Sequence, residues 1–557
     1  MPKTKIVATI GPASFNENIL KNMARKGLSV IRINTAHIEP GYILSVSKLL
    51  NKINSDLNTK IGIMVDLKGP ELRTGLFKSG YINIEAGKNY VISSANTNAD
   101  ITLNHDITKY IDEETVIAIN DGKIHFKVLS VKDNDITTTA LDSGIIHDTS
   151  RVNIPGRYID LGTITERDKI FIGEGIKSGA TFYALSFVQQ KENVYDLQDY
   201  IYESGSSASI VSKIETKKGY DNIESIVNAS DFIMVARGDL GVELPLKEVA
   251  MAQKKIIMES HRKAVPTIVA TQMLESMVNA DSPTRAEVSD VTNAILDDTD
   301  ALMLSEETAI GKYPVEAVSY LSDISEFVES HKLSFSEPET IFTDRLAFSI
   351  SLGLRRIVEG VDINSIIALT KSGHTARIIS SIRPEQDIYA VVTSENLAKA
   401  LNLLRGVIPV VVPKNYVNSN NIYDIINELS SKNILRAGQK TIVISGSPSL
   451  IFGGTNDIKV LNIGAFLGRG YAVGKSIKGK INTGNGSGNI LIADSYDKNA
   501  EYTKFDAVIF RSCVSERIKD YFINNNITLV YNTEFSSNIM PDMEINVDSD
   551  TGIITYI

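Results

Sequence analysis

The sequence is poor in cysteine, in long apolar runs and in surplus basic residues. Cys513 is the only cysteine among 557 residues, so no intrachain disulfide can form and a reducing compartment is expected. No run approaches the roughly 20 apolar residues of a membrane-spanning helix, and the early run KIVATI is too short for a signal peptide. The formal net charge of -10 argues against nucleic-acid and anionic-membrane partners. We therefore expect a cytoplasmic protein with neither partner.

What the sequence does contain is a regular alternation of strand-like and helix-like segments. The first strands are KIVATIG, SVIRIN and KIGIMVDL, with helices up to about Lys26 and through Leu50. After an interruption the alternation resumes with a helix over Glu166 to Ser178 and the strands TFYALSF, SIVSKIE, FIMVARG, TIVATQM and ALMLSEE. Three strands before the interruption and five after it predict a (β/α)8 barrel in residues 1–70 and 158–334.

The interruption, residues 71–157, has short alternating runs of a different kind. GYINIEAG, YVISS, VIAINDGKIHFKVLSV and ITTTALDSG predict antiparallel hairpins, with a turn at Asp121-Gly122. This segment leaves the barrel after its third strand, at the face where barrel enzymes build their sites. The sequence therefore predicts an inserted antiparallel β-domain that can act as a lid and exclude water.

Two further domains are predicted after the barrel. Residues 335–469 carry the strands SIIALT, IYAVVT, VIPVVV and TIVISG, which alternate with helices and indicate an α/β domain. Residues 470–557 include, from Ala472, AVGKSIKGKINTGNGSGN, whose Gly/Ser/Asn stretch predicts a loop. The apolar runs NILIAD, FDAVIF and NITLVY follow, and they indicate a small extra C-terminal domain.

The segment Ser209 to Gly241 brings three charged residues together. It reads as a strand, a helix from Thr216 and a second strand. The period of two along a strand puts Lys213 and Glu215 on one face, and Asp239 follows the second strand. These groups could form a structural ion pair. Alternatively, Glu215 and Asp239 hold a divalent cation, which prefers oxygen ligands, and Lys213 neutralises a phosphoryl group in transfer.

Other polar residues also gather where the predicted barrel strands end, which core packing alone does not require. They are Arg32, Asn34, Asp66, Thr271 and Glu307.

The loop TKSGHT, residues 370–375, offers hydroxyl and backbone N–H groups before a helix that is expected to start near Ala376. Such a loop can bind a phosphate at the helix N-terminus, but an ordinary N-cap has the same sequence pattern. The residues alone leave both interpretations open.

Over roughly residues 1–465 the chain resembles the pyruvate kinase family, of the bacterial type with an extra C-terminal domain. The matching stretches, in order, are TKIVATIGPAS, RINTAH, VDLKGPELRTG, VNIPG, SKIET, MVARGDLGVELP, VATQMLESM and PTRAEVSDVTNAILDDTDALMLSEETAIGKYP. The resemblance implies a barrel with an inserted lid, an α/β regulatory domain and a homotetramer. It also implies a glycolytic enzyme that transfers a phosphoryl group from phosphoenolpyruvate to ADP, giving pyruvate and ATP.

The resemblance implies a role for each matched residue. Lys213 would stabilise the phosphoryl group in flight, Glu215 and Asp239 would hold Mg²⁺ or Mn²⁺, and Thr271 would lie beside the enolate carbon that takes up a proton. The remaining implied positions are the catalytic and substrate-binding Arg32, the substrate-binding Gly238, the nucleotide-binding His37 and Arg73, the monovalent-cation ligands Asn34, Asp66 and Leu67 (through its carbonyl), and the sugar-phosphate effector residues Thr370, Lys371, Ser372, Gly373 and Thr375.

Several positions depart from the family pattern. Ala36 replaces a serine whose hydroxyl would help to bind K⁺, although Glu71 fits cation-dependent members, so K⁺ dependence stays open. Gln189 and Gln190 replace an Arg-Lys pair, which removes two positive charges that Lys191 or another residue would have to supply. Glu306 replaces a glycine.

The extra C-terminal domain is positioned like one that resembles a swivelling phosphohistidine domain in some bacterial members. No histidine follows His374, so phosphohistidine chemistry is excluded there and a packing or interface role remains.

Alternative functions follow from the same residues. A barrel lysine is compatible with a Schiff-base aldolase and paired carboxylates with a metal-dependent aldolase, but neither requires the inserted lid. The departures at Ala36, Gln189, Gln190 and Glu306 motivate a second hypothesis, a catalytically weak, metabolite-sensing regulatory protein. Lys213, Glu215, Asp239 and Thr271 are all present, which favours the active enzyme.

Overall fold

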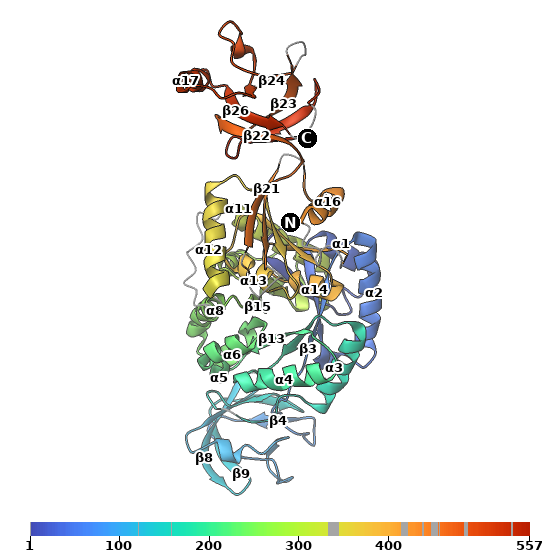
Figure 1. Ribbon diagram of the computed structural model, residues 1–557. Helices are drawn as coiled ribbons and strands as arrows, with labels where there is room; N and C mark the ends of the chain where they lie inside the picture. Colours follow the sequence, from blue (N-terminus) through green and yellow to red (C-terminus); the bar gives the residue numbers. More distant parts are fainter. Residues whose placement is uncertain are drawn as a thin grey trace. The chain divides into compact units, whose positions relative to one another are not determined.

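The structure is a computed structural model that describes residues 2–120, 122–157, 159–331, 345–413, 422–436, 439–446, 455, 457–483, 488–535 and 539–556. The chain forms two compact units (Figure 1). The first comprises residues 1–351, 372–384 and 394–409, and the second residues 352–371, 385–393 and 410–557. Asp121 of the expected hairpin turn and the expected domain boundaries at 158 and 334/335 lie outside the described residues.

The first unit is built on a closed parallel barrel, as the strand count predicts. Its strands pair in the order β1-β16-β15-β14-β13-β12-β3-β2. The barrel closes where β1 pairs with β16, with Lys5 opposite Ala301. The strands are β1 Lys5–Thr9, β2 Leu28–Asn34, β3 Gly62–Asp66, β12 Phe182–Leu185, β13 Ser209–Ile214, β14 Phe232–Ala236, β15 Thr267–Ala270 and β16 Ala301–Leu304.

Helices surround this barrel, because its strands are apolar on both faces and must be covered. The helix expected over Glu166–Ser178 is confirmed; Thr165 begins it with a capping box to Asp168. The helices are α1 Glu17–Arg25, α2 Tyr42–Leu57, α3 Glu166–Ser178, α4 Lys191–Glu203, α5 Lys217–Asp221, α6 Ile223–Ala229, α7 Arg237–Glu243, α8 Leu246–His261, α9 Arg285–Leu296, α10 Glu306–Ala309 and α11 Pro314–His331.

The prediction of one helix from Thr216 is wrong in one respect, because this segment forms two short helices, α5 and α6. Thr216 is the N-cap of α5, and Asn222 separates the two helices. The Asn222 amide donates to the carbonyl of Gln189, at 2.8 Å. The break lies at Asn222 itself, whose φ and ψ of -94° and 14° fall outside the α-helical region.

The inserted β-domain is mainly antiparallel, as expected, and it follows β3 in the chain (Figure 1). One sheet has the order β11-β7-β8-β9-β5-β6 and a smaller one pairs β10 with β4; the short β5–β6 pair is parallel. The strands are β4 Tyr81–Ile84, β5 Asn89–Ser93, β6 Ile101–Thr102, β7 Val116–Ile119, β8 Ile124–Lys132, β9 Asp135–Ala140, β10 Gly144–His147 and β11 Val152–Asn153.

The expected α/β sheet has the strand order β19-β18-β17-β20-β21. The edge strand β21 is antiparallel and was not predicted. The strands are β17 Ser365–Leu369, β18 Asp387–Val392, β19 Val407–Val411, β20 Lys440–Ser445 and β21 Asp457–Asn462, and the helices along this part of the chain are α12 Arg345–Gly360, α13 His374–Ser381, α14 Glu395–Leu401 and α16 Ile422–Ser431.

The C-terminal residues of the second unit form a second closed barrel, in the order β22-β26-β25-β24-β23-β27-β28. Two details differ from the sequence prediction: β22 begins at 465, before the expected boundary at 470, and residues 477–482 of the expected loop region form β23. Residues 484–487 lie outside the described residues. The elements are β22 Ala465–Val473, β23 Ile477–Asn482, β24 Ile490–Ala493, β25 Ala507–Phe510, α17 Glu516–Asn524, β26 Thr528–Phe535, β27 Glu544–Val547 and β28 Ile553–Tyr556.

Each unit also contains a buried ionic cluster. In the first, the Arg383 guanidinium contacts Asp300 and His261. Burial and the Arg383 charge lower the pKa of His261 to about 4. In the second, Lys440 lies 2.8 Å from the buried carboxylate of Asp548. Removing either cation would leave a buried group without its charged partner.

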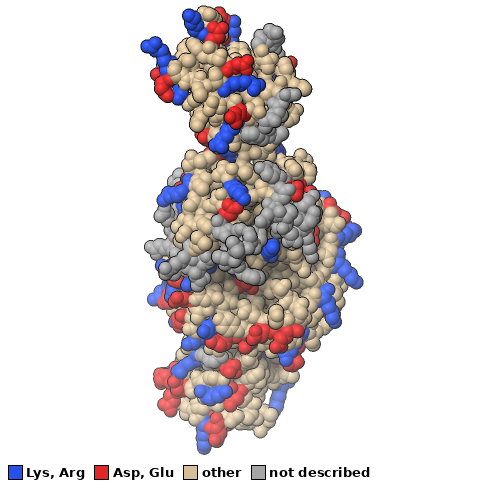
Figure 2. Space-filling model, in the orientation of Figure 1, with Lys and Arg blue, Asp and Glu red and all other residues tan. Residues whose placement is uncertain are grey.

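No helix among the described residues is long and apolar enough to cross a membrane. Acidic and basic side chains are interspersed over the visible face of the molecule (Figure 2).

Candidate active site

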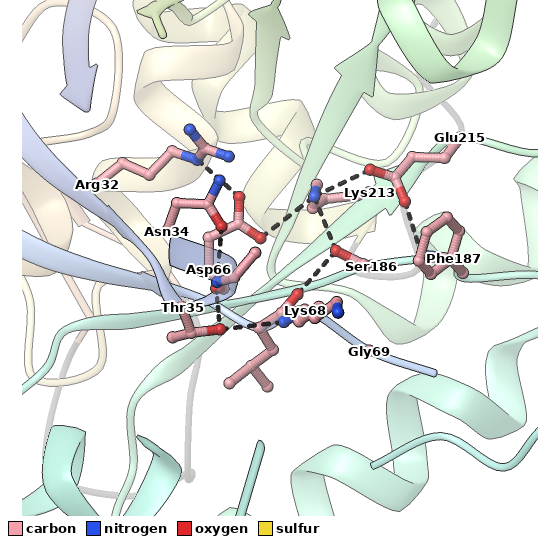
Figure 3. A network of polar contacts seen from close by, with 12 residues as sticks. Arg32, Asn34, Thr35, Asp66, Lys68, Gly69, Ser186, Phe187, Lys213 and Glu215 are labelled. Carbon is pink, nitrogen blue, oxygen red and sulfur yellow. Dashed lines mark hydrogen bonds and ion pairs between the residues drawn. The ribbon is translucent and has the colours of Figure 1, made fainter. Parts of the chain in front are cut away.

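The central feature of the site is a buried polar network at the carboxyl ends of β2, β3, β12 and β13 (Figure 3). Asp66 accepts from Arg32 Nε at 2.6 Å and from Lys213 Nζ at 3.2 Å. Lys213 also donates to Ser186 Oγ at 2.8 Å and lies 2.9 Å from Glu215 Oε1. The acceptors fix the ammonium group at one position inside the barrel mouth.

The charges in this network depend on one another, because the groups are nearly removed from solvent. Asp66 and Glu215 are each 2% exposed, and Lys213 is 9% exposed. Burial would raise the pKa of Asp66, but Lys213 and Arg32 hold it below its ordinary value. Burial would lower the pKa of Lys213, but Asp66 and Glu215 raise it. Burial raises the pKa of Glu215 despite the charge of Lys213, and the charge of Asp239 adds to this rise.

The two predicted divalent-cation ligands lie in neighbouring βα connections. Glu215 directly follows β13, and its Oε2 accepts the N–H of Phe187 at 2.8 Å. Asp239 lies in the first turn of α7, which follows β14, and its carboxylate contacts the Arg151 guanidinium. No cluster of three or more His, Cys, Asp or Glu suited to a metal occurs among the described residues. Two carboxylates fit Mg²⁺ or Mn²⁺, which retain positions for water and substrate phosphate.

The oxygen atoms predicted to bind a monovalent cation are engaged by donors of the protein. Asn34 Oδ1 accepts the N–H of Ala36 at 3.1 Å, and the Leu67 carbonyl accepts from Ser186 Oγ at 2.8 Å. The hydroxyl of Thr35 donates to the Asp66 carbonyl at 2.8 Å. Thr35 therefore places a hydroxyl beside the Asp66 carbonyl, one residue before the position where Ala36 lacks one.

The two predicted nucleotide-binding residues have different surroundings. His37 ends the 3-10 helix η1 Thr35–His37 and is exposed. Arg73 pairs with Glu71 at 2.7 Å and donates to the Thr149 carbonyl at 2.6 Å, so it already belongs to a local ionic contact of the inserted β-domain.

Backbone strain marks the end of β15. Thr271 and Gln272 have φ values of 68° and 54°, an uncommon conformation for residues other than glycine and a genuine outlier for the β-branched Thr271. Thr271 Oγ1 accepts the N–H of Gly238 at 2.9 Å, and Arg237 donates to the carbonyl of Thr271. The contacts hold the hydroxyl of Thr271 against the start of α7, which carries Asp239.

Two acidic residues after β16 differ in their surroundings. Glu307 is buried and accepts the N–H groups of Leu274 and Ser305 at 3.1 and 2.7 Å, so it organises two loops. Burial raises the pKa of Glu307. Glu306, whose orientation the sequence left open, is exposed.

Gln189 and Gln190 lie at the start of α4. Their backbone N–H groups donate to Asn193 Oδ1 at 3.1 and 3.2 Å, which shapes the helix N-terminus. Gln189 Oε1 is buried without a hydrogen bond, and this side chain borders a pocket that also includes Pro70, Ser186 and Phe187. The two glutamines therefore adjoin the site, as their sequence position suggests.

The predicted effector loop precedes α13, which begins at His374 rather than near Ala376. Gly373 is its N-cap, with a left-handed φ of 89° and no side-chain cap. Thr370 and Lys371 belong to the second compact unit, and Ser372, Gly373 and Thr375 to the first. Phosphate binding by this loop stays a prediction.

Sequence reasoning missed four residues of the site: Thr35, Arg151, Ser186 and Phe187. The position of Ser186 and Phe187 directly after β12 was a usable signal, because other site residues also follow barrel strands. No local pattern distinguishes Arg151, whose contact with Asp239 joins residues 88 positions apart.

Comparison with known proteins gives consistent matches. Residues 1–318 match the family described as "Pyruvate kinase, barrel domain" and residues 349–461 match "Pyruvate kinase, alpha/beta domain". A pyruvate kinase of Thermoplasma acidophilum is 46% identical over 553 residues, which cover 99% of this chain and 98% of that protein. Pyruvate kinase 2 of Synechocystis is 35% identical, over 92% of this chain and 86% of that protein.

A solved structure is also similar. The crystal structure of a pyruvate kinase from Cryptosporidium parvum has a TM-score of 0.75 and 31% sequence identity, and the match covers 83% of this chain and 96% of that one.

Proposed function

Because the chain belongs to the pyruvate kinase family, we propose that it transfers the phosphoryl group of phosphoenolpyruvate to ADP, giving pyruvate and ATP in glycolysis. It is a phosphotransferase. The observation that best supports the assignment of the chemistry to particular residues is the network of Asp66, Lys213 and Glu215 at the barrel mouth (Figure 3).

Lys213 carries the electrostatic part of the proposed reaction. An oxygen of the ADP β-phosphate bonds to phosphorus while the bond from phosphorus to the enol oxygen breaks, and negative charge spreads over the phosphoryl oxygens. An ammonium group held by Ser186 and two carboxylates needs little reorganisation to stabilise that charge. Arg32, anchored to Asp66, supplies a second positive group for the substrate phosphate.

Glu215 and Asp239 would hold the divalent cation. Bound Mg²⁺ or Mn²⁺ would neutralise charge on the substrate carboxylate and phosphate. The burial of Glu215 and its bond from the Phe187 N–H orient this carboxylate before any ligand arrives. Gly238 has no side chain to occupy the space beside Thr271, where a Cβ would lie 3.5 Å from Thr271 Oγ1.

Thr271 is the proposed residue beside the enolate carbon. After phosphoryl transfer the enolate must take up a proton at its methylene carbon to become pyruvate. A hydroxyl group fixed between Gly238 and the Ala270 carbonyl, on a strained backbone, is suited to orient the proton donor.

Several finer assignments extend this proposal. His37 and Arg73 would contact the nucleotide, and residues 370–375 would bind a sugar-phosphate activator. The family resemblance further supports a homotetramer in the cytoplasm. K⁺ would bind oxygens of Asn34, Asp66 and Leu67 that already accept a hydrogen bond from the protein, because such an oxygen has a further lone pair for the ion.

The experiment that tests the function is pyruvate formation from phosphoenolpyruvate and ADP with Mg²⁺. The reaction is run with K⁺ and with K⁺ replaced by a bulky organic cation. We expect turnover in at least the K⁺ reaction. Turnover in both would mean that K⁺ is dispensable, and turnover only with K⁺ would mean that the remaining oxygen ligands suffice.

Absence of turnover in both reactions, even with sugar phosphates added, would contradict the proposal. The chain would then be better described as a metabolite-sensing protein that keeps the fold of the family.

A further inference from the structure

The inserted β-domain contributes an arginine to the barrel mouth. Arg151 directly precedes β11 and forms an isolated bridge with Arg73 at the base of this domain. Its guanidinium contacts the carboxylate of Asp239, and its Cζ lies 4.8 Å from the centre of the Phe187 ring. The Arg151 side chain is only 18% exposed. The Asp239 side chain is 30% exposed, so this is a partly buried contact in which Arg151 touches both a carboxylate and an aromatic ring.

The surroundings of Arg151 are the carboxylates to which the metal is assigned. Burial would lower the pKa of Arg151, but the charges of Asp239, Glu215 and Glu71 raise it. Phe187, over which the guanidinium stacks, also donates its backbone N–H to Glu215. Arg151 therefore supplies positive charge to both Glu215 and Asp239 from outside the barrel.

A second contact fixes β11 to the same helix. Asn153 of β11 donates to Glu243, the last residue of α7, at 3.1 Å, whereas Arg151 contacts Asp239 in the first turn of the same helix. Release of Asp239 by Arg151 would remove one of these two attachments of the inserted β-domain to α7.

A divalent cation and a guanidinium compete for the same carboxylate, since like charges repel strongly within about 4 Å in a partly desolvated site. Resting on the proposed function, we propose that Arg151 is a resident counter-ion for Asp239, which the divalent cation must displace. Metal binding thereby releases Arg151 from Asp239, and the freed guanidinium becomes available to a phosphate oxygen of the substrates.

The affinity for the divalent cation should therefore depend on Arg151, which is not itself a metal ligand. A neighbouring opposite charge changes the proton affinity of a carboxylate by roughly 10- to 1000-fold. We expect the competition from Arg151 to have an effect at the lower end of this range, because Arg151 leaves rather than stays beside the bound metal.

The test measures Mn²⁺ binding directly, with the full-length protein and no substrate, from the electron paramagnetic resonance signal of free Mn²⁺. We expect Arg151→Met to lower the Kd for Mn²⁺ about tenfold. Arg151→Lys, which keeps the charge and is less prone to disturb folding, should stay close to the unsubstituted protein. Arg157→Met is the matched control, because Arg157 pairs with the exposed Asp112 in the same β-domain.

Hydrogen exchange gives an independent readout. The amides of residues 151–153 should exchange faster in the unsubstituted protein when Mn²⁺ is added, and the addition should make little difference in Arg151→Met. A structural role for Arg151 alone would not produce this dependence on the metal.

An unchanged or raised Kd in Arg151→Met, with normal Mn²⁺ binding by the unsubstituted protein, would overturn the inference and leave the metal assignment intact. Absence of Mn²⁺ binding by both proteins would overturn the metal assignment together with the inference. Normal pyruvate formation with an unchanged Kd would separate the failure of this inference from failure of the proposed function.

Discussion

Replacement of Lys213 by methionine would remove the cation that contacts both Asp66 and Glu215. Lys213 Nζ lies 3.2 Å from Asp66 and 2.9 Å from Glu215, and it also donates to Ser186. Methionine retains much of the apolar stem, so the barrel mouth keeps most of its packing. The substitution therefore tests the charge more than the volume of the side chain.

The expected effect on turnover follows from the position of the charge. Loss of one positioned group that stabilises developing charge typically costs about 10² to 10³ in kcat, and loss of a full positive charge on a phosphoryl group costs up to about 10⁵. We expect kcat to fall by about 10³-fold in Lys213→Met. The KM for ADP should change much less, because the proposed role is in the transition state.

The effect on stability should depend on pH. Asp66 keeps its contact with Arg32, whereas Glu215 loses a cation and its pKa, already raised by burial, rises further above its ordinary value. A carboxyl group whose pKa is raised by folding is most favourable below its unfolded pKa, and it loses this contribution as the pH rises through its folded pKa. The variant should be about 3 kcal/mol less stable than the unsubstituted protein in mild alkali, and the difference should shrink on acidification.

The assays are pyruvate formation and thermal unfolding over a range of pH. Lys169→Met is the control, since Lys169 forms an exposed pair with Glu166 on α3. Unchanged turnover in Lys213→Met would refute the assignment of its charge to the transition state. A stability difference that did not vary with pH would refute the coupling between Lys213 and Glu215.

Three further predictions concern other parts of the chain. Thr271→Ala should lower kcat about 100-fold while Thr271→Ser largely preserves it, and equal activity of the two variants would exclude a role for the hydroxyl. Burial beside Arg383 lowers the pKa of His261 to about 4 in the folded protein, against about 6.5 in the unfolded chain. Between these two pH values only the unfolded chain takes up a proton at this histidine, so the free energy of unfolding falls as the pH falls from 6.5 toward 4. His261→Gln should therefore remove about 3 kcal/mol of the loss in unfolding free energy between pH 6.5 and 4, measured by denaturant unfolding at each pH, and an unchanged pH dependence would contradict the assignment. Lys440→Met should destabilise the second unit by about 2 kcal/mol, because it removes a charged contact from the buried Asp548; calorimetry that showed no change would refute this.

The order and type of most elements could be predicted from the sequence. Buried parallel strands read as short apolar runs, and their alternation with helical segments is sufficient to indicate a barrel. Since all strands of such a barrel end at one face, the polar residues after them had to be neighbours. That argument correctly brought Asp66, Lys213 and Glu215 together.

Other features depend on contacts that no local pattern encodes. The break between α5 and α6 lies at Asn222, whose side chain bonds to the Gln189 carbonyl 33 positions away. The closure of residues 465–556 into a barrel required pairing of β22 with both β26 and β28. Periodicity indicated several of these strands but not their order.

The sequence by itself determined the barrel, the inserted β-domain and the residues at the strand ends, because periodicity and chain direction are local properties. Only the tertiary structure decided which charges meet. Asp66 pairs with Lys213 across 147 positions, and Arg151 reaches Asp239 from a different domain. The ionisation of buried groups depends on all charges nearby, so the electrostatics of this site exist only once the chain has folded.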